Sequence, residues 1–328
     1  MTESPKYVVG VDIGGTKVFS GVIDKSGKIY STAKEKTLAY EGFEVSFIQI
    51  VACIEKAIEE SPVTLEEIQA IGVGSPGPLD IEKGIIIDTP NLKWKNIPLK
   101  DRLEAHFKKP VKIDNDVNTG TLGELVYGAG KGVKHMIGLF VGTGLGGGVI
   151  IDGKLLHGFN QNGGELGHTI INPKGPRCAC GVRGHLEAYA SKGGIEKAIR
   201  LAMAKGQRSI LAKKLKNNKG PLKSSKIVQA YDSGDLVVRK AVNRSARYLG
   251  LGLSSFLNIF NPEVVVLGGG VIESFGQSYV NKVIQVAQNN TFEISLKNVK
   301  IVPAELGDNS VILGASVLAF QILKNSEK

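Results

Sequence analysis

The chain has 328 residues, and its 41 lysines and arginines exceed its 31 aspartates and glutamates, giving a formal net charge of +10. A composition of 42% hydrophobic and 22% charged residues is typical of globular proteins and excludes a disordered chain, a collagen-like fibre and a coiled coil. No apolar run reaches the ~18–20 residues of a membrane helix, and Glu3 and Asp12 interrupt the stretch where a signal peptide would lie. We therefore expect a cytoplasmic protein, with two domains because a single core rarely grows beyond roughly 250–300 residues.

Two segments predict the same three-stranded β-meander. In residues 7–30, apolar β-branched runs flank a Gly-Gly turn, and a second turn leads to a third strand. Residues 137–157 repeat this pattern about 130 residues later, again with a glycine-rich turn and then an Asp-Gly turn. Two copies of one unit suggest two related lobes facing each other across a cleft.

Strands and helices alternate in the rest of the chain, which predicts an α/β protein with mixed sheets. Polar, irregular sequence separates the second meander from a helical region that ends at Asn261-Pro262. The expected elements are a helix over 43–61, a strand over 70–73, a helix over 99–107, a strand over 110–113, helices up to about 260, a strand in EVVVLGGGV and a last helix from about 310.

Eight basic residues and no acidic residue lie between positions 205 and 226 and account for most of the net charge. Such a run is typical of a solvated surface; the alternative is a site for an anionic partner. No aromatic side chain in the run could stack on bases, so no nucleic-acid partner is expected. The eight residues are Lys205, Arg208, Lys213, Lys214, Lys216, Lys219, Lys223 and Lys226.

Three glycine turns, at 14–17, 142–148 and 268–270, are candidates for phosphate binding. Their backbone N–H groups can approach phosphate oxygens without side-chain obstruction, although any one alone could be a tight hairpin turn. Three together favour a nucleotide, and Asp12 beside the first turn could orient Mg²⁺ and its waters. The candidate nucleotide-binding residues are Asp12, Gly14, Gly15, Thr16, Lys17, Thr143, Gly144, Gly268 and Gly269.

Four side chains that can ligate zinc lie within eighteen positions: His168, Cys178, Cys180 and His185. Tetrahedral zinc accepts such a mixture of thiolates and imidazoles. The alternative is a loop with two unliganded cysteines. The third cysteine, Cys53, lies on the apolar face of the first predicted helix and is expected in the core.

Eight segments in order make the chain resemble the ROK family of sugar kinases and sugar-responsive repressors, most closely its bacterial glucokinases. The resemblance runs from about residue 7 to the end and leaves only 205–226 poorly matched. It implies an α/β, two-lobed actin-like (hexokinase/Hsp70-type) ATPase fold with duplicated β-meander/helix units and a central cleft for sugar and ATP. The segments are VDIGGTKVFSGVID, IGVGSPGPLD, DTPNLKW, IDNDVNTGTLGE, VGTGLGGGVIIDGKL, GGELGHTIIN, CACGVRGHLEAYAS and PEVVVLGGGV.

The same resemblance implies a small domain over 1–118, rejoined by the last helix at about 305–328, and a large domain over 119–304 that carries the zinc loop. The family motif has Cys where this chain has His185, and the set that remains is still Cys₂His₂. Bound zinc would fix the loop over 163–187 and orient His168 and Glu187 toward the sugar.

The site residues also follow from the resemblance. By itself, Asp114-Asn115-Asp116 could simply cap the next helix, but similarity to the family's Asn-Asp pair implies that Asp116 is the general base of phosphoryl transfer. Glu165 and Glu187, without their flanking motifs, would be ordinary surface carboxylates. The sugar ligands implied are Gly77, Asn91, Asn115, Asp116, Glu165, His168 and Glu187.

The expected activity is ATP-dependent phosphorylation of a hexose, most simply glucose at its 6-hydroxyl. Mannose, fructose, N-acetylglucosamine, N-acetylmannosamine and allose remain alternative acceptors, and polyphosphate an alternative donor, although the complete glycine turns favour ATP. A ROK-type repressor is the alternative from another class, but the six residues before Tyr7 do not accommodate a helix-turn-helix. The expected assembly is a homo-oligomer, either a dimer or a tetramer.

Overall fold

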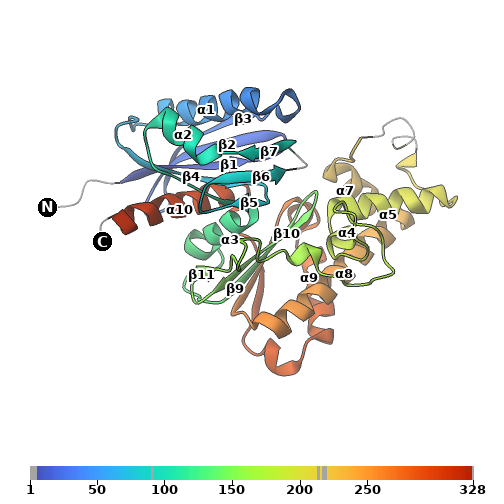
Figure 1. Cartoon of the computed structure of the whole chain (residues 1–328). Helices are drawn as coiled ribbons and strands as arrows, with labels where there is room; N and C mark the ends of the chain where they lie inside the picture. The colour runs from blue at the N-terminus through green and yellow to red at the C-terminus, as the bar shows by residue number, and fades with distance from the viewer. Residues whose placement is uncertain (1–5, 90–91, 213–214, 216–219, 327–328) are drawn as a thin grey trace. The chain divides into compact units, whose positions relative to one another are not determined.

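The computed structural model describes residues 6–89, 92–212, 215 and 220–326, in which strands and helices alternate as the sequence predicts (Figure 1). The chain divides into two compact units. The first comprises Met1–Val133, Val149–Gly164 and Glu305–Lys328, and the second comprises Lys134–Gly148 and Glu165–Ala304. The domain boundary expected after residue 118 stays a prediction.

A five-stranded sheet in the order β3-β2-β1-β4-β8 forms the centre of the first unit. The first three strands are antiparallel and confirm the predicted meander, whereas β4 and β8 continue the sheet parallel to β1. The strands are β1 (Tyr7–Ile13), β2 (Lys17–Asp24), β3 (Ile29–Lys36), β4 (Ile68–Ser75) and β8 (Val111–Asn115).

Helices cover both faces of this sheet (Figure 1). Helix α1 packs on β2 and β3, and its apolar face joins the main core of the unit, which includes Cys53 as expected. Helix α10 packs on β1 and β4 from the other side and also against α3. The helices are α1 (Phe43–Glu59), α2 (Leu99–Phe107), α3 (Asp116–Tyr127) and α10 (Ser310–Ser326), with short 3-10 helices at Ala39–Glu41 and Gly307–Asn309.

The backbone of α10 can approach the sheet closely because two paired strand residues are glycines. A Cβ atom on Gly10 would lie 2.0 Å from the carbonyl oxygen of Ile312, and one on Gly72 would lie 1.8 Å from that of Ala315. Any larger residue at either position would push the helix away from β1 and β4.

A small antiparallel sheet of β5 (Leu79–Asp80), β6 (Ile85–Thr89) and β7 (Trp94–Ile97) completes the first unit. Trp94 lies in the core, and its ring meets the edge of Phe43 with centroids 5.2 Å apart. The sheet begins directly after the cis peptide bond between Gly77 and Pro78. It thereby anchors the irregular GSPGPLD segment.

The sheet of the second unit repeats the plan of the first. Its strands follow the order β10-β9-β12-β13, with β12 parallel to both β9 and β13. Strand β10 continues past Gly148 into the first unit, where it pairs with β11, so the second predicted meander is also confirmed. The strands are β9 (Met136–Val141), β10 (Leu145–Ile151), β11 (Lys154–Leu155), β12 (Val264–Gly268) and β13 (Lys300–Pro303).

The helices of the second unit include the long α8, which packs against α9. Helix α8 ends at Phe260, where Asn261 takes the left-handed conformation with φ 43° before Pro262, as the sequence predicts. The helices are α4 (Glu187–Ala190), α5 (Lys192–Ala204), α7 (Ser224–Asp232), α8 (Leu236–Phe260) and α9 (Gly270–Asn290), with 3-10 helices at Leu166–His168 and Glu293–Leu296.

Half of the basic run can be placed. Its described members Lys205, Arg208, Lys223 and Lys226 are all exposed, which agrees with a solvated surface. Lys213, Lys214, Lys216 and Lys219 lie outside the described residues. Within the part of the chain that the structure describes, we find no helix long and apolar enough to cross a membrane.

Candidate active site and metal centre

Four of the predicted site residues gather at one edge of the first sheet. Strands β1, β4 and β8 are neighbours and parallel. The carboxyl ends of β1 and β8 carry Asp12 and Asn115, and Gly77 and Asp116 follow the ends of β4 and β8. In α/β sheets, ligands bind outside the carboxyl ends of such strands. The fold therefore places the predicted base and the predicted sugar ligands of this unit at the edge where a substrate would bind.

Asn115 caps helix α3, so the simpler interpretation of the Asp-Asn-Asp turn holds for this residue. Its Oδ1 accepts hydrogen bonds from the backbone N–H groups of Val117 and Asn118 at 2.9 and 3.2 Å. Its Nδ2 faces Gly77, where an added Cβ would lie 3.8 Å away. Because the cap uses only Oδ1, the Nδ2 of Asn115 can donate to a ligand. The other predicted amide ligand, Asn91, lies outside the described residues.

Asp116 is the first residue of α3 and follows the cap directly. One carboxylate oxygen accepts from the N–H of Val117 at 2.9 Å. A helix N-terminus favours negative charge, because its free N–H groups and the helix dipole point toward it. The position therefore suits an ionised carboxylate that accepts a proton.

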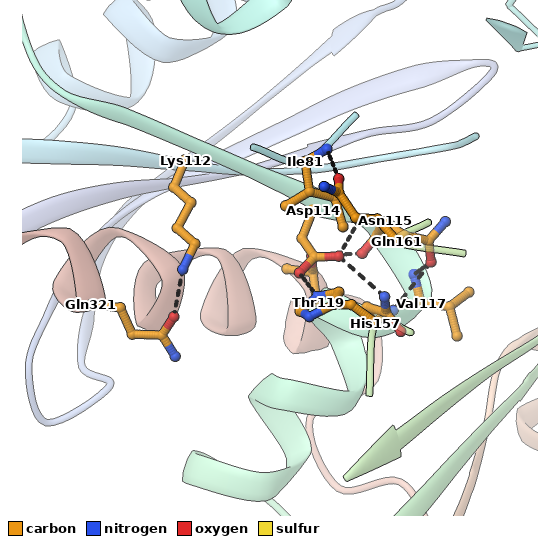
Figure 2. A network of polar contacts seen from close by, with 10 residues as sticks. Ile81, Lys112, Asp114, Asn115, Val117, Thr119, His157, Gln161 and Gln321 are labelled. Carbon is orange, nitrogen blue, oxygen red and sulfur yellow. Dashed lines mark hydrogen bonds and ion pairs between the residues drawn. The ribbon is translucent and has the colours of Figure 1, made fainter. Parts of the chain in front are cut away.

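Asp114 has a contact that the sequence did not indicate. Its carboxylate lies 2.7 Å from the Nε2 of His157, a residue of the segment after β11, and the two join a network with the first turn of α3 (Figure 2). In the sequence, His157 ends the second predicted meander, and no spacing rule connects it to a residue 43 positions earlier.

The first glycine turn joins β1 to β2 and is exposed. Within it, the N–H of Gly14 donates to the carbonyl of Lys17 at 2.9 Å. The buried Thr37 supports the turn from below, since its hydroxyl donates to the carbonyl of Gly14 at 2.6 Å and its N–H donates to the carbonyl of Thr16. The turn is exposed and is held in place by hydrogen bonds from Thr37, so a phosphate group can approach it.

Charged groups surround Asp12 at the base of this turn. Lys17 and Lys34 both reach Asp308, at 3.3 and 3.4 Å, and neither Lys34 nor Asp308 was predicted from the sequence. Burial, reinforced by the nearby Asp116, raises the pKa of Asp12 to about 7, while Lys17 opposes this shift. A bound divalent cation would favour the ionised form, so the residue suits the predicted Mg²⁺ role.

Replacing Asp12 by Asn should raise the free energy of unfolding at pH 8 by up to about 4 kcal/mol, from about 1.4 kcal/mol per pKa unit. The pKa of Asp12 is higher in the folded state than in the unfolded state. The stability that protonated Asp12 contributes to the folded state is therefore fully present below about pH 4 and is lost as the pH rises through about 7. The gain should therefore shrink toward pH 4. Urea unfolding of the magnesium-free protein at pH 5 and pH 8 measures it.

The exposed Asp88 on β6 provides the control for that measurement. Asp88→Asn should show no pH-dependent gain. An equal gain for Asp12→Asn at both pH values would mean that Asp12 is not the buried charge that opposes folding.

In the second unit, the two other glycine turns lie next to each other. Strand β9 leads into Gly142-Thr143-Gly144, and the neighbouring parallel strand β12 leads into Gly268-Gly269. Gly269 has φ 87°, and a Cβ there would lie 2.8 Å from the backbone nitrogen of Val141. The structure thus brings Thr143, Gly144, Gly268 and Gly269 to one edge of this sheet, at the start of helix α9.

Glu187 is more than a surface carboxylate. Its Oε2 accepts from the N–H of Leu145 at 3.0 Å, and its Oε1 lies 3.0 Å from the sulfur of Cys178. A Cβ on Gly144 would be only 2.6 Å from this carboxylate. Glu187 therefore connects the glycine turn to the cysteine loop.

The four predicted metal ligands come together. One ligand atom from each of His168, Cys178, Cys180 and His185 lies within 4.8 Å of the others. The Nδ1 atoms of the two histidines are 3.1 Å apart, and the sulfur of Cys180 is 3.2 Å from that of His185. Tetrahedral zinc spaces such ligands by about 3.3–3.8 Å, so a small adjustment would suffice.

The protonation of one ligand, His185, suits a metal, whereas that of Cys178 opposes it. Burial and the neighbouring His168 lower the pKa of His185, which keeps it in the neutral form that binds metals. Burial and Glu187 raise the pKa of the Cys178 thiol to about 12, so zinc would have to displace a proton from it.

His168 could serve both of its predicted roles with different ring atoms. Its Nδ1 belongs to the metal cluster, whereas its Nε2 lies 3.8 Å from a carboxylate oxygen of Glu165. A metal-bound imidazole commonly presents its second ring nitrogen to an acceptor, and this fixes the orientation of the ring. Glu165 itself is exposed, as a ligand-binding carboxylate can be.

Replacing Cys178 by Ser should lower zinc affinity by at least about 10–100-fold, the loss that even outer partners of a metal site can cause. Elemental analysis after dialysis should find about one zinc per chain in the parent protein and far less in the variant. Cys53→Ala controls for the number of thiols and should keep the metal, because Cys53 is buried in the other unit. Equal zinc content in all three proteins would show that this cluster is not the site.

Comparison with known proteins agrees with the fold. A ROK family model matches residues 8–322. The glucokinase of Halalkalibacterium halodurans is 32% identical over 99% of this chain and 98% of its own length. The xylose repressor of Caldicellulosiruptor bescii is 34% identical over 94% of this chain and 76% of its own length. The structure of a ROK family glucokinase from Streptomyces griseus, in complex with glucose and AMPPNP, superposes with a TM-score of 0.81 at 32% identity, covering 96% of this chain and 99% of that chain.

These findings show to which class of protein the chain belongs. The fold is the α/β, actin-like ATPase fold of the ROK sugar kinases, as the repeated sheet plan indicates. The chain belongs to the ROK family. Glucokinases are among its similar relatives, which supports a sugar kinase, and a repressor is among them as well.

Proposed function

We propose that this protein is an ATP-dependent hexose kinase that transfers the γ-phosphoryl group of ATP to the 6-hydroxyl of glucose. The observation that carries the proposal is the position of Asp116: a carboxylate at the N-terminus of α3, directly after Asn115 and close to Asp12. A base for the hydroxyl and a carboxylate suited to Mg²⁺ thus stand at one sheet edge.

The reaction proposed is a single displacement. As the sugar oxygen attacks the γ-phosphorus, its proton passes to the carboxylate of Asp116, and the bond from the γ-phosphorus to the bridging oxygen of ADP breaks. A positioned base of this kind contributes about 10²–10⁴-fold. Placement and charge stabilisation supply the remainder, as in other phosphoryl transfers.

The sugar would be held by groups that can each pair with a hydroxyl. Asn115 and Asp116 offer an amide and a carboxylate in the first unit, next to the backbone of Gly77. Glu165, His168 and Glu187 offer carboxylates and an imidazole in the second unit. A site built from such groups rejects analogues that lack a hydroxyl, because its own polar groups would stay unpaired.

The nucleotide would be held by the glycine turns at the two sheet edges. Lys17 beside the first turn supplies a cation for the phosphates, and the turns at 142–144 and 268–270 supply backbone N–H groups. Mg²⁺, when bound, would neutralise phosphate charge, with Asp12 holding it. The binding of AMPPNP, an ATP analogue, by the Streptomyces griseus relative supports ATP as the donor.

We further propose a structural role for zinc. Bound zinc would fix the loop over 163–187, which carries Glu165, His168 and Glu187, and His168 belongs both to the metal cluster and to the predicted sugar ligands. Bound zinc would hold these three side chains in place for the sugar. In the loop held in this way, the residues that are oriented toward the sugar are His168, through its Nε2, and Glu187.

A coupled assay for ADP release tests the function. Purified protein with Mg-ATP is offered glucose, mannose, fructose, N-acetylglucosamine and N-acetylmannosamine, and polyphosphate replaces ATP in a second series. Turnover that depends on the sugar and is highest with glucose is the expected result. Preference for another acceptor would correct the substrate but not the reaction.

The repressor relative defines the outcome that would overturn the proposal. If no sugar supports ADP release while glucose or xylose still raises the melting temperature, the protein binds sugars without phosphorylating them. The resemblance to the xylose repressor would then describe its function better than the resemblance to glucokinases does.

A further inference from the structure

The residue before the proposed catalytic pair is a completely buried carboxylate. Asp114 is buried, and one of its oxygens, Oδ1, already accepts hydrogen bonds at the start of α3. That oxygen accepts from the N–H of Asn115 at 2.7 Å and from the side-chain amide of Asn118 at 3.1 Å. The orientation of Asp114 and the geometry of the Asn115-Asp116 turn therefore depend on each other.

The second oxygen of Asp114 has one described partner, His157. Its Nε2 lies 2.7 Å from Oδ2, and its side chain is 33% exposed whereas that of Asp114 is 1% exposed (Figure 2). The hydrogen bond to Asp114 raises the pKa of His157, although burial and the nearby Lys112 oppose the shift. The Nζ of Lys112 donates a hydrogen bond to the side-chain oxygen of Gln321 at 2.9 Å, so Lys112 does not replace His157 as the partner of Asp114.

His157 is itself fixed by the segment that carries it. Its carbonyl accepts from the N–H of Gly163 at 2.7 Å, and a Cβ on Gly163 would lie 2.8 Å from the same carbonyl carbon, so this turn is closely packed. Four residues after His157, the side chain of Gln161 accepts a hydrogen bond from the N–H of Ile81, directly after β5 (Figure 2). The segment thus contacts both the strand that follows Gly77 and the turn that carries Asp116.

We propose that His157 is a positioning residue: by binding Asp114, it holds the Asn115-Asp116 turn in the orientation that receives the sugar hydroxyl and its proton. The inference rests on the proposed kinase function. Without His157, the buried carboxylate would keep one oxygen unpaired and would turn toward other donors, which are the N–H groups of the same turn. Asp116 would then lose its alignment with the reacting oxygen, and displacements of about 1 Å can cost about 100-fold in rate.

Two substitutions separate this role from simple packing. His157→Gln keeps a side-chain N–H the same number of bonds from the backbone as Nε2, so it can still donate to Asp114. His157→Leu has a similar bulk and no donor. If His157 only fills space, Leu should replace it at least as well as Gln does. If the hydrogen bond matters, the order is reversed.

The experiment measures kcat and KM for both substrates in these variants of the full-length protein. We expect kcat of His157→Leu to fall by about 10–100-fold with KM for ATP little changed, and His157→Gln to recover most of the loss. His106→Leu is the matched control, because His106 also pairs with a carboxylate of the first unit, Glu55, at 3.1 Å, but on the surface. It should keep the parent kcat.

Other outcomes overturn the inference. Parent-like kcat in His157→Leu, or equal losses in the Gln and Leu variants, would show that the bond to Asp114 does not position the base. If His157→Leu fails to fold, His157→Asn takes its place, since its shorter side chain is polar but does not reach Asp114. An inactive parent protein would instead refute the kinase function, and this inference with it.

Discussion

Replacing Asp116 by Asn should lower kcat by about 10²–10⁴-fold while the protein stays folded and still binds the sugar. The amide keeps the shape of the side chain and can still form hydrogen bonds, but it cannot accept the proton of the attacking hydroxyl. The variant should stay close to the parent in stability, because it removes a negative charge close to the buried Asp12 but also loses the favourable interaction of that charge with the N-terminus of α3. Steady-state kinetics with the preferred sugar and a thermal melt measure both effects.

The control is Asp101→Asn, which changes an exposed carboxylate in the first turn of α2 in the same way. It should keep the parent kcat. If Asp116→Asn were as active as this control, the proton would have another acceptor, and the base would have to be sought among the other carboxylates at this sheet edge. A fall in melting temperature that matched the loss of activity would point to misfolding instead.

The elements of the fold could be predicted from the sequence wherever local chemistry decides the backbone. The two meanders followed from β-branched runs separated by glycine turns, and the end of α8 followed from Asn261-Pro262. Cys53 was correctly expected in the core, because its position on α1 lies on the apolar face. Each of these features depends on residues a few positions apart.

The candidate site was predictable only in part. The metal cluster could be expected because its four ligands lie within eighteen positions, and Asp116 because the chain resembles a known family. The pair of Asp114 with His157 and that of Lys17 with Asp308 join residues 43 and 291 positions apart. Such contacts depend on how β8, α3 and the last helix pack, and no local pattern in the sequence records that packing.

The pKa of Asp12 shows the same limit. The sequence indicated a carboxylate beside a glycine turn, but its raised pKa comes from burial and from Asp116, more than 100 positions later in the chain. A charge that opposes folding at neutral pH and would be relieved by a cation is typical of a functional site. That property belongs to the folded edge of the sheet rather than to either segment.

Replacing Gly314 by Ala should destabilise the first unit by about 3 kcal/mol, the upper part of the range for overpacked cores. Gly314 faces α3 from α10, and a Cβ there would lie 1.7 Å from the carbonyl oxygen of Thr119 and 2.9 Å from the nitrogen of Gly123. Both contacts are with backbone, so no side-chain rotation can relieve them and the two helices must separate. The better helix propensity of Ala returns only about 1 kcal/mol.

Urea unfolding measures this effect against Gly270→Ala, at the start of α9, where an added Cβ would meet no atom within 4 Å. That control should be as stable as the parent or slightly more so. The consequence for function follows from α3, because the helix that moves is the one that begins with Asp116. We therefore expect kcat to fall together with stability in Gly314→Ala, whereas parent-like stability would mean that α10 and α3 can separate at no cost and that their close packing does not hold the proposed base in place.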